Sequence, residues 1–260
     1  MEKIIAITNQ KGGVGKTTTA INLAASFGKL GKRTLLIDMD PQGNTTSGLG
    51  IDKRKLTSSV YDVLLNIDKI NQAIVSTKFD NLHILPSNMA LAGAEIELAG
   101  LENRESKLSQ AVNLIKHQYD YIFVDCPPSL GLVTTNALCL SDSVIVPIQC
   151  EFYALEGLSQ LMSTVRRIKR TYNPRLDVEG VLLTMVDGRL RLTQQVSQEI
   201  KKYFSDKVFE TVIPRTVKLS ESPGFGVPVI YYDRYNKGAR AYLTLAEDIL
   251  KNHGRESEAK

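Results

Sequence analysis

The chain has 260 residues, of which 43% are hydrophobic and 23% charged, with a formal net charge of +4. These proportions are those of an ordinary globular protein and exclude wholesale disorder. No apolar run approaches the roughly 20 residues that span a bilayer. The 3 cysteines show neither a disulfide framework nor metal-ligand spacing, so we expect a soluble protein of a reducing, cytoplasmic compartment.

Short apolar runs alternate with longer amphipathic stretches along the chain. The predicted strands are 4–8, 34–38, 82–86, 121–125, 144–147, 180–186 and 208–214. The predicted helices are 16–29, 104–117, 155–172, 192–204 and 239–252. Several runs are continuously apolar, as in parallel strands covered on both faces. The alternation predicts an α/β fold with a doubly wound, mostly parallel sheet flanked by helices. We expect one domain over residues 1–252 and a polar, frayed tail over 253–260.

A glycine-rich segment follows the first predicted strand: Lys11, Gly12, Gly13, Val14, Gly15, Lys16, Thr17 and Thr18. It matches the G-x-x-x-x-G-K-[ST] phosphate loop, except that Gln10 stands where the first glycine would be. In such a loop the backbone amides and a helix N-terminus surround the phosphates. Lys16 is predicted to neutralise the β- and γ-phosphates, and Thr17 to ligate Mg²⁺.

Aspartates follow two other predicted strands. Asp38 and Asp40 lie at the end of the second strand, and Asp125 ends the strand at 121–125. Because ligands bind at the carboxyl ends of parallel strands, we expect these side chains to surround the same nucleotide. Asp125 is placed to hold Mg²⁺ through water, and Asp40 to orient the attacking water. Asp38 has a structural alternative, a strand-end carboxylate that accepts bonds from loop amides.

Taken together, several segments resemble the ParA/MinD group of deviant Walker ATPases, and specifically the short chromosomal ParA (Soj-like) type. An early lysine in K-G-G-x-G-K-[ST] marks this group off from ordinary phosphate loops. The resemblance runs from Met1 to the last predicted helix, and the segments that carry it are 9–19, 38–44, 124–129, 147–151 and 213–215.

The resemblance implies that ATP brings two subunits face to face as a homodimer. Lys11 would then reach the phosphates of the other subunit's nucleotide, and Gly12 must stay small because the two loops nearly touch. Asp40 would position water for slow hydrolysis, which resets the dimer to monomers, and Pro214 would contact the base. Weaker candidates, for the switch region, are Gln42 and Asn44.

The same resemblance implies DNA segregation, in which the ATP-bound dimer binds double-stranded DNA without sequence preference on the nucleoid. A ParB-type protein would stimulate hydrolysis. Contacts from arginine and lysine to phosphates suffice for such binding. Family basic positions match Arg189 and Lys218, while Arg191, Lys237 and Arg240 are candidates by charge alone. Residues 161–260 hold 18 basic and 12 acidic side chains, which is compatible with a polyanion partner.

The alternative is a MinD-like ATPase that positions the cell-division site. Such a protein shares the nucleotide motifs but ends in a basic amphipathic helix that binds membrane. No apolar face continues after Leu250, so we expect no membrane partner. A tyrosine kinase of the deviant Walker type is a weaker alternative, because the cluster Tyr231, Tyr232 and Tyr235 precedes a further predicted helix.

Overall fold

The computed structural model describes residues 2–151 and 154–258. Within these residues, 7 strands form one sheet in the order β3-β4-β2-β5-β1-β6-β7. The strands are β1 (Lys3–Ile7), β2 (Thr34–Asp38), β3 (Val75–Ser76), β4 (Leu82–Leu85), β5 (Tyr121–Asp125), β6 (Ser143–Gln149) and β7 (Asp177–Thr184). Neighbouring strands are parallel, except that β3 is antiparallel to β4. The prediction of a mostly parallel sheet is confirmed.

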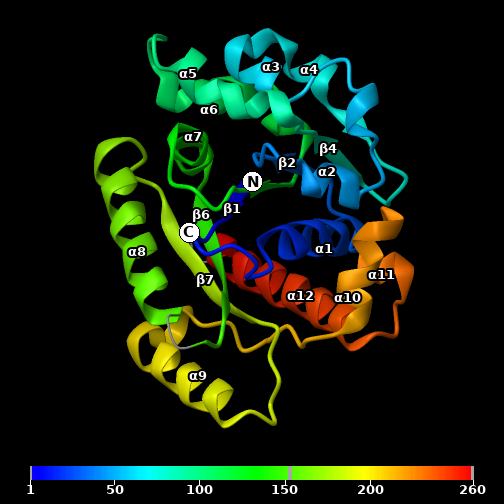
Figure 1. Cartoon of the computed structure of the whole chain (residues 1–260), viewed down its shortest axis with the longest axis vertical. Helices are drawn as coiled ribbons and strands as arrows, with labels where there is room; N and C mark the ends of the chain where they lie inside the picture. The colour runs from blue at the N-terminus through cyan, green and yellow to red at the C-terminus, as the bar shows by residue number, and fades with distance from the viewer. Residues whose placement is uncertain (1, 152–153, 259–260) are drawn as a thin grey trace.

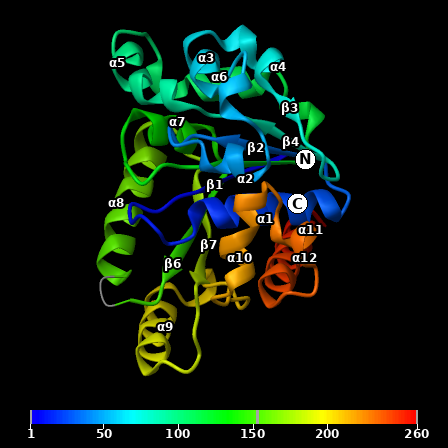
Figure 2. The ribbon, with the colours of Figure 1, turned by 45° about the vertical axis from the view of Figure 1, so that its right-hand side comes forward.

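Helices cover both faces of this sheet (Figure 1). They are α1 (Lys16–Lys29), α2 (Asn44–Gly48), α3 (Val60–Leu65), α4 (Ile70–Ala73), α5 (Ala94–Leu98), α6 (Lys107–Asn113), α7 (Leu132–Leu140), α8 (Ala154–Thr171), α9 (Arg191–Phe204), α10 (Val217–Glu221), α11 (Val229–Tyr232) and α12 (Lys237–Glu258). Figure 2 shows α3, α4 and α6 above β2 and β4, with α1, α11 and α12 below. The sheet is therefore doubly wound, as predicted.

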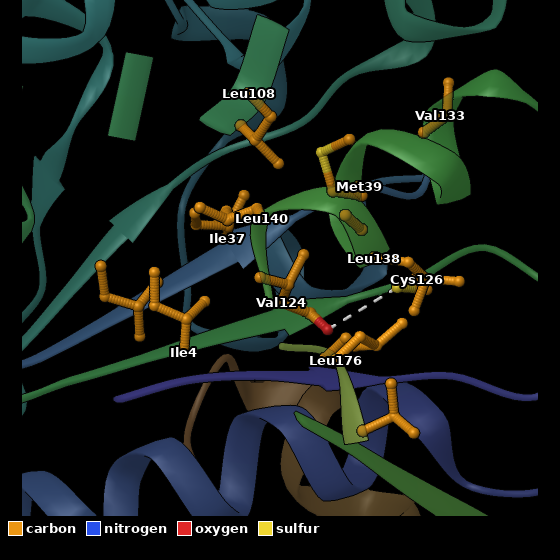
Figure 3. Close-up of a cluster of buried hydrophobic side chains, with 14 of the residues drawn as sticks. Ile4, Ile37, Met39, Leu108, Val124, Cys126, Val133, Leu138, Leu140 and Leu176 are labelled. Atoms are coloured by element: carbon orange, nitrogen blue, oxygen red, sulfur yellow. Dashed lines mark hydrogen bonds between the residues drawn. The ribbon is translucent and has the colours of Figure 1, made fainter. Parts of the chain in front are cut away.

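Side chains of each central strand alternate between two apolar cores. In β1, Ile4 and Ala6 belong to the core beneath α6 and α7, whereas Ile5 and Ile7 belong to the core shared with α1 and α12. Figure 3 shows part of the first core, where Ile4 lies near Val124. Full burial of one large aliphatic side chain stabilises the fold by about 1.5–3 kcal/mol. Both faces of β1 therefore hold the carboxyl end of this strand firmly in place.

Residues 208–214 do not form the strand that their apolar pattern predicts. They run beside β7 but form only isolated bridges, Val208 with Val181 of β7 and Pro214 with Val186 just beyond the end of β7. Between these bridges, the Thr211 hydroxyl donates a hydrogen bond to Asp248 of α12, at 3.0 Å. A proline also lacks the N–H that a continuous ladder needs. Ile213 is buried along the sheet edge, and the other apolar residues of the segment, Val208, Phe209 and Val212, are partly buried there. The apolar pattern alone does not distinguish this packing from a strand.

The helix predicted over 104–117 is also wrong in detail, because it is divided into three pieces. The 3₁₀ turns η4 (Arg104–Ser106) and η5 (Lys116–Gln118) flank α6. The backbone leaves the helical region at Ile115, whose φ is −127°. A β-like φ at this position ends the i to i−4 hydrogen bonding, so the apolar period continues while the α-helix does not.

The last helix contradicts the prediction of a frayed tail from residue 253. It continues to Glu258, and the side chain of His253 is largely buried. Nε2 of His253 lies 2.7 Å from Oε1 of Glu179, and Nδ1 lies 3.1 Å from the hydroxyl of Tyr121. These polar contacts hold a segment whose sequence has no apolar face, which explains why hydropathy missed it.

Candidate nucleotide-binding site

The glycine-rich segment forms a loop between the carboxyl end of β1 and the start of α1. Gly13 and Gly15 have φ values of 76° and 91°, in a region that residues with a Cβ rarely adopt. Asn9 fixes the loop from below, because its amide donates to the carbonyl of Pro147 at 2.8 Å and accepts from the amide of Lys11 at 3.0 Å. The loop shape is thus set by the backbone and by one buried asparagine.

Lys16 points into this loop and is only 7% exposed. Its ammonium donates to the carbonyl oxygen of Lys11, at 3.0 Å. Burial lowers the pKa of Lys16, and the negative charges of Asp125 and Asp40 partly oppose that decrease. A buried ammonium beside a glycine-rich loop at a helix N-terminus suits an anion, and phosphate fits that chemistry.

Two hydroxyls converge on Asp125, at the end of β5. The hydroxyls of Thr17 and Thr45 both donate to its Oδ2, at 2.8 Å and 2.6 Å. Its other oxygen, Oδ1, is buried and has no hydrogen-bond partner among the described residues. Burial, followed by the charge of Asp38, raises the pKa of Asp125 to about 7. Such an unsatisfied buried oxygen requires a further donor or a cation to offset its desolvation.

These residues fit magnesium. Among the described residues, no group of three or more histidine, cysteine, aspartate or glutamate side chains could hold a metal by itself. Magnesium is usually bound by one or two carboxylates together with phosphate oxygens and water. The Asp125 carboxylate and the Thr17 hydroxyl, next to a phosphate-binding loop, would hold Mg²⁺ in this way and would help it neutralise phosphate charge.

Asp38 has the structural role that the sequence left open. It pairs in register with Asp125 across β2 and β5, and it accepts bonds from the amide and hydroxyl of Thr46 at 2.9 and 2.7 Å. It also accepts the amide of Asp40, at 3.1 Å. Burial raises the pKa of Asp38 to about 6, although these hydrogen bonds oppose the increase. Asp38 therefore anchors the loop that carries Asp40, which is half-buried at the site.

A cleft of about 360 Å³ lies beside the phosphate loop. Its lining includes Gly15, Thr18 and Pro214, the residue predicted to contact the base. The hydroxyl of Thr184, at the end of β7, donates to the carbonyl of Val14 at 2.7 Å and joins the loop to this side of the cleft. The cleft is therefore continuous with the loop, where a base would extend from bound phosphates.

Lys11 and Gly12 lie at the outer side of the loop. The ammonium of Lys11 forms an ion pair with Glu151, which follows β6, and both side chains are about 40% exposed or more. A Cβ added at Gly12 would meet nothing within 4 Å. Nothing inside the described chain therefore requires a glycine at position 12. The ammonium of Lys11 is held by Glu151, a residue outside the loop.

The predicted DNA contacts are both paired with nearby acids. Arg189, in the turn after β7, makes a two-pronged pair with Asp187 at 2.9 and 2.6 Å. Lys218, in α10, lies 3.0 Å from Glu221. The structure does not bring these two cations into one cluster by any contact. The candidates chosen by charge alone are Lys237 and Arg240, both exposed at the start of α12, and Arg191, whose side chain lies outside the described part of the structure.

Sequence reasoning missed several residues that shape the site, among them Thr45, Thr184 and Glu151. Thr45 directly follows segment 38–44, and Glu151 is the last residue of segment 147–151. Both segments carry the resemblance to the family. Their types gave no signal, because a threonine or glutamate beside a motif is common on any surface. Their contacts become visible only in the structure, where α2 lies beside Asp125 and the residue after β6 lies beside Lys11.

The chain matches the family model described as an AAA domain over residues 2–178. It is 56% identical to the sporulation initiation inhibitor protein Soj of Bacillus subtilis, over 97% of this chain and 100% of that protein. It is 52% identical to the chromosome partitioning protein ParA of Myxococcus xanthus, over 96% of this chain and 88% of that protein.

Among solved structures, a cobyrinic acid a,c-diamide synthase from Mycobacterium smegmatis with bound ADP and magnesium has a TM-score of 0.87. It is 36% identical to this chain, and the match covers 98% of this chain and 96% of that protein. The Soj and ParA relatives are more similar in sequence and are matched along nearly the whole of both chains. The chain therefore belongs to the ParA/Soj family of chromosome-partitioning proteins.

Proposed function

We propose that this protein is a Mg²⁺-dependent ATPase of DNA segregation. In this proposal ATP joins two copies face to face, the dimer binds double-stranded DNA without sequence preference, and hydrolysis returns it to monomers. A ParB-type DNA-binding protein stimulates the hydrolysis. The observation that carries the proposal is the convergence of Lys16, Thr17 and Asp125 on one phosphate-binding loop, with the partly unsatisfied Asp125 carboxylate beside it.

Each residue has a role that follows from its position. Lys16 balances the charge of the phosphates inside the loop, and Thr17 with Asp125 would hold Mg²⁺. Asp40 belongs to a loop that Asp38 anchors, and its carboxylate would orient a water molecule for attack on the terminal phosphate. Pro214 bounds the cleft in which the adenine would lie. The bound ADP and magnesium of the Mycobacterium smegmatis structure support the choice of an adenine nucleotide and Mg²⁺ as the ligands.

The dimer rests on Lys11 and Gly12. The open space at Gly12 is compatible with the close approach of a second loop, since no atom of the described chain limits its size. Lys11 carries its charge to the rim of the loop, where it would neutralise phosphates bound by the partner once it leaves Glu151. An exposed pair of this kind contributes only about 0–1 kcal/mol, so bound triphosphate can displace it.

DNA binding would use Arg189 and Lys218 as phosphate contacts, which requires DNA to replace Asp187 and Glu221 as their partners. Such contacts carry no base sequence and weaken as salt rises. Arg189→Glu should dimerise with ATP but lose DNA binding. Unchanged affinity of that variant for DNA would place the contact surface elsewhere.

The decisive experiment measures binding to a random-sequence DNA duplex with ATP, with ADP and without nucleotide. Wild type is compared with Asp40→Ala, which should bind ATP but hydrolyse it slowly and so accumulate on DNA. We expect binding only with ATP, with a steep decrease as salt is raised. Binding under no condition would contradict the segregation function, and normal turnover by Asp40→Ala would remove the catalytic role of Asp40.

A MinD-like function at a membrane is the second candidate, and it would require an apolar face of the last helix that is free to enter a lipid surface. Among the described residues, no helix is both long enough and apolar enough to cross a membrane. In α12, the large apolar residues Tyr242, Leu245 and Ile249 are buried against the core shared with α1. They are therefore occupied in the fold. Sedimentation with anionic lipid vesicles, with and without ATP, tests this candidate directly.

A further inference from the structure

Two adjacent threonines cover two adjacent aspartates at the site. Asp38 and Asp125 pair in register at the ends of β2 and β5. Thr45 donates its hydroxyl to Asp125 at 2.6 Å, and the next residue, Thr46, donates its hydroxyl to Asp38 at 2.7 Å. Both threonines are fully buried in the first turn of α2. One short helix thus contacts both carboxylates.

The two contacts differ in how completely they satisfy the aspartate. Asp38 receives three donors, which are the amide and hydroxyl of Thr46 and the amide of Asp40. Both of its oxygens accept, so the Thr46 contact completes a structural network. The hydroxyl of Thr46 also accepts the amide of Ser87, at 2.9 Å. Thr46 therefore needs no ligand to explain its position.

Asp125 is only half satisfied. Thr45 and Thr17 both donate to Oδ2, and Oδ1 has no partner among the described residues although it is buried. An unsatisfied buried carboxylate oxygen is costly, and a structural role for the two hydroxyls does not account for it. The arrangement fits a carboxylate held by one oxygen so that the other can accept from a ligand.

We propose that Thr45 is a positioning residue for magnesium, which fixes Asp125 through Oδ2 and leaves Oδ1 available to the hydrated metal. This inference rests on the proposed function. The Thr17 hydroxyl is itself a metal ligand there, so Thr45 provides the contact to Asp125 that need not change. Thr45 and Thr46 are consecutive residues of α2, so one helix contacts both Asp125 and Asp38. Asp38 in turn anchors the loop that carries Asp40. The orientation of Asp125 is thereby coupled to the position of that loop.

The test measures ADP affinity by isothermal titration calorimetry, once in Mg²⁺ and once in EDTA, for the full chain. The ratio of the two affinities reports how strongly the metal is held, without hydrolysis, dimerisation or DNA. Partners of metal ligands typically change metal affinity by about 10- to 100-fold when they are removed. We expect Thr45→Val, which keeps the shape and removes the hydroxyl, to reduce the ratio by about tenfold or more. Its ADP affinity in EDTA should change little.

Thr45→Ser restores the hydroxyl and should restore most of the ratio. Thr34→Val is the matched control, because Thr34 is equally buried and donates to the Lys32 carbonyl, away from the site. An unchanged ratio in Thr45→Val, or equal losses with and without Mg²⁺, would overturn the proposal. If Thr45→Val does not fold, a lost ratio in Thr45→Ser would overturn it. Failure of wild type to bind ADP at all would instead contradict the proposed function.

Discussion

Two buried carboxyl groups, those of Asp38 and Asp125, lie side by side at the site. Burial is the main cause that raises the pKa of both, to about 6 and about 7 from a usual value of 3.8. At pH values between the usual pKa and the raised pKa, the folded protein therefore retains protons on these two carboxyls that the unfolded chain has released. Stability from this source is fully present below the unfolded pKa and is lost as the pH rises through the folded values.

We expect the free energy of unfolding, measured in EDTA without nucleotide, to fall as the pH rises from about 4 to about 7. Each proton held only by the folded state contributes a slope of at most about 1.4 kcal/mol per pH unit. Asp38→Asn should reduce this slope, and the exposed carboxylate variant Asp68→Asn should not. Urea unfolding at several pH values measures it, and a slope equal to wild type in Asp38→Asn would contradict the assignment.

The ion pair between Lys11 and Glu151 would compete with any contact that Lys11 makes to a second subunit. Glu151→Gln removes the partner that holds Lys11 within its own chain, so ATP-dependent dimerisation should become tighter. Exposed pairs are worth up to about 1 kcal/mol, which corresponds to about fivefold. Analytical ultracentrifugation in the Asp40→Ala background measures the change. Glu156→Gln, in the first turn of α8, is the control, because Glu156 is exposed and has no ion pair among the described residues. Weaker dimerisation of Glu151→Gln would refute the idea.

Lys16 and Asp125 could be identified from the sequence because their signal is local. A lysine at the end of a glycine-rich loop and an aspartate at the end of an apolar strand are each fixed by neighbours in the chain. Thr45 could not be identified, because its contact with Asp125 joins residues 80 positions apart. The same limit applied to Glu151, whose partner Lys11 is 140 positions away.

Among the secondary-structure elements, the strands that are buried on both faces were the easiest to predict. The residues of β2 and β5 are all buried, and their apolar runs have the same bounds in sequence and structure. Residues 208–214 have a similar pattern but only border the sheet. Apolar periodicity reports burial, and at a sheet edge burial does not require a hydrogen-bonded ladder.

We expect the contacts of His253 to stabilise the end of α12, which hydropathy did not predict to be helical. His253→Ala removes the contacts to Glu179 and Tyr121 and leaves a largely buried carboxylate with fewer partners. Loss of such contacts typically costs about 1–3 kcal/mol. We expect a decrease of that size in chemical denaturation. The exposed neighbour Asn252→Ala should cost much less, and equal effects of the two substitutions would contradict the anchoring role of His253.

At the scale of the whole molecule, the phosphate loop lies at the rim with open space at Gly12. Gly12→Val should therefore fold and bind ATP with little change, yet remain a monomer, because the added side chain would enter the space of a second loop. Thermal melting and ATP binding provide the controls, and light scattering with ATP gives the result. A normal dimer of Gly12→Val would refute the face-to-face arrangement.

The two lateral edges of the sheet are unsuited to joining further strands. One edge is β3, which spans only two residues, and the other is β7, along which residues 208–214 run. Edges that are short or covered resist the strand-to-strand pairing that leads to aggregation. A protein that crowds onto a polymer reaches high local concentration, where an open edge would be hazardous. In the proposed function, these short and covered edges would let copies of this chain gather densely on DNA while the nucleotide alone controls their association.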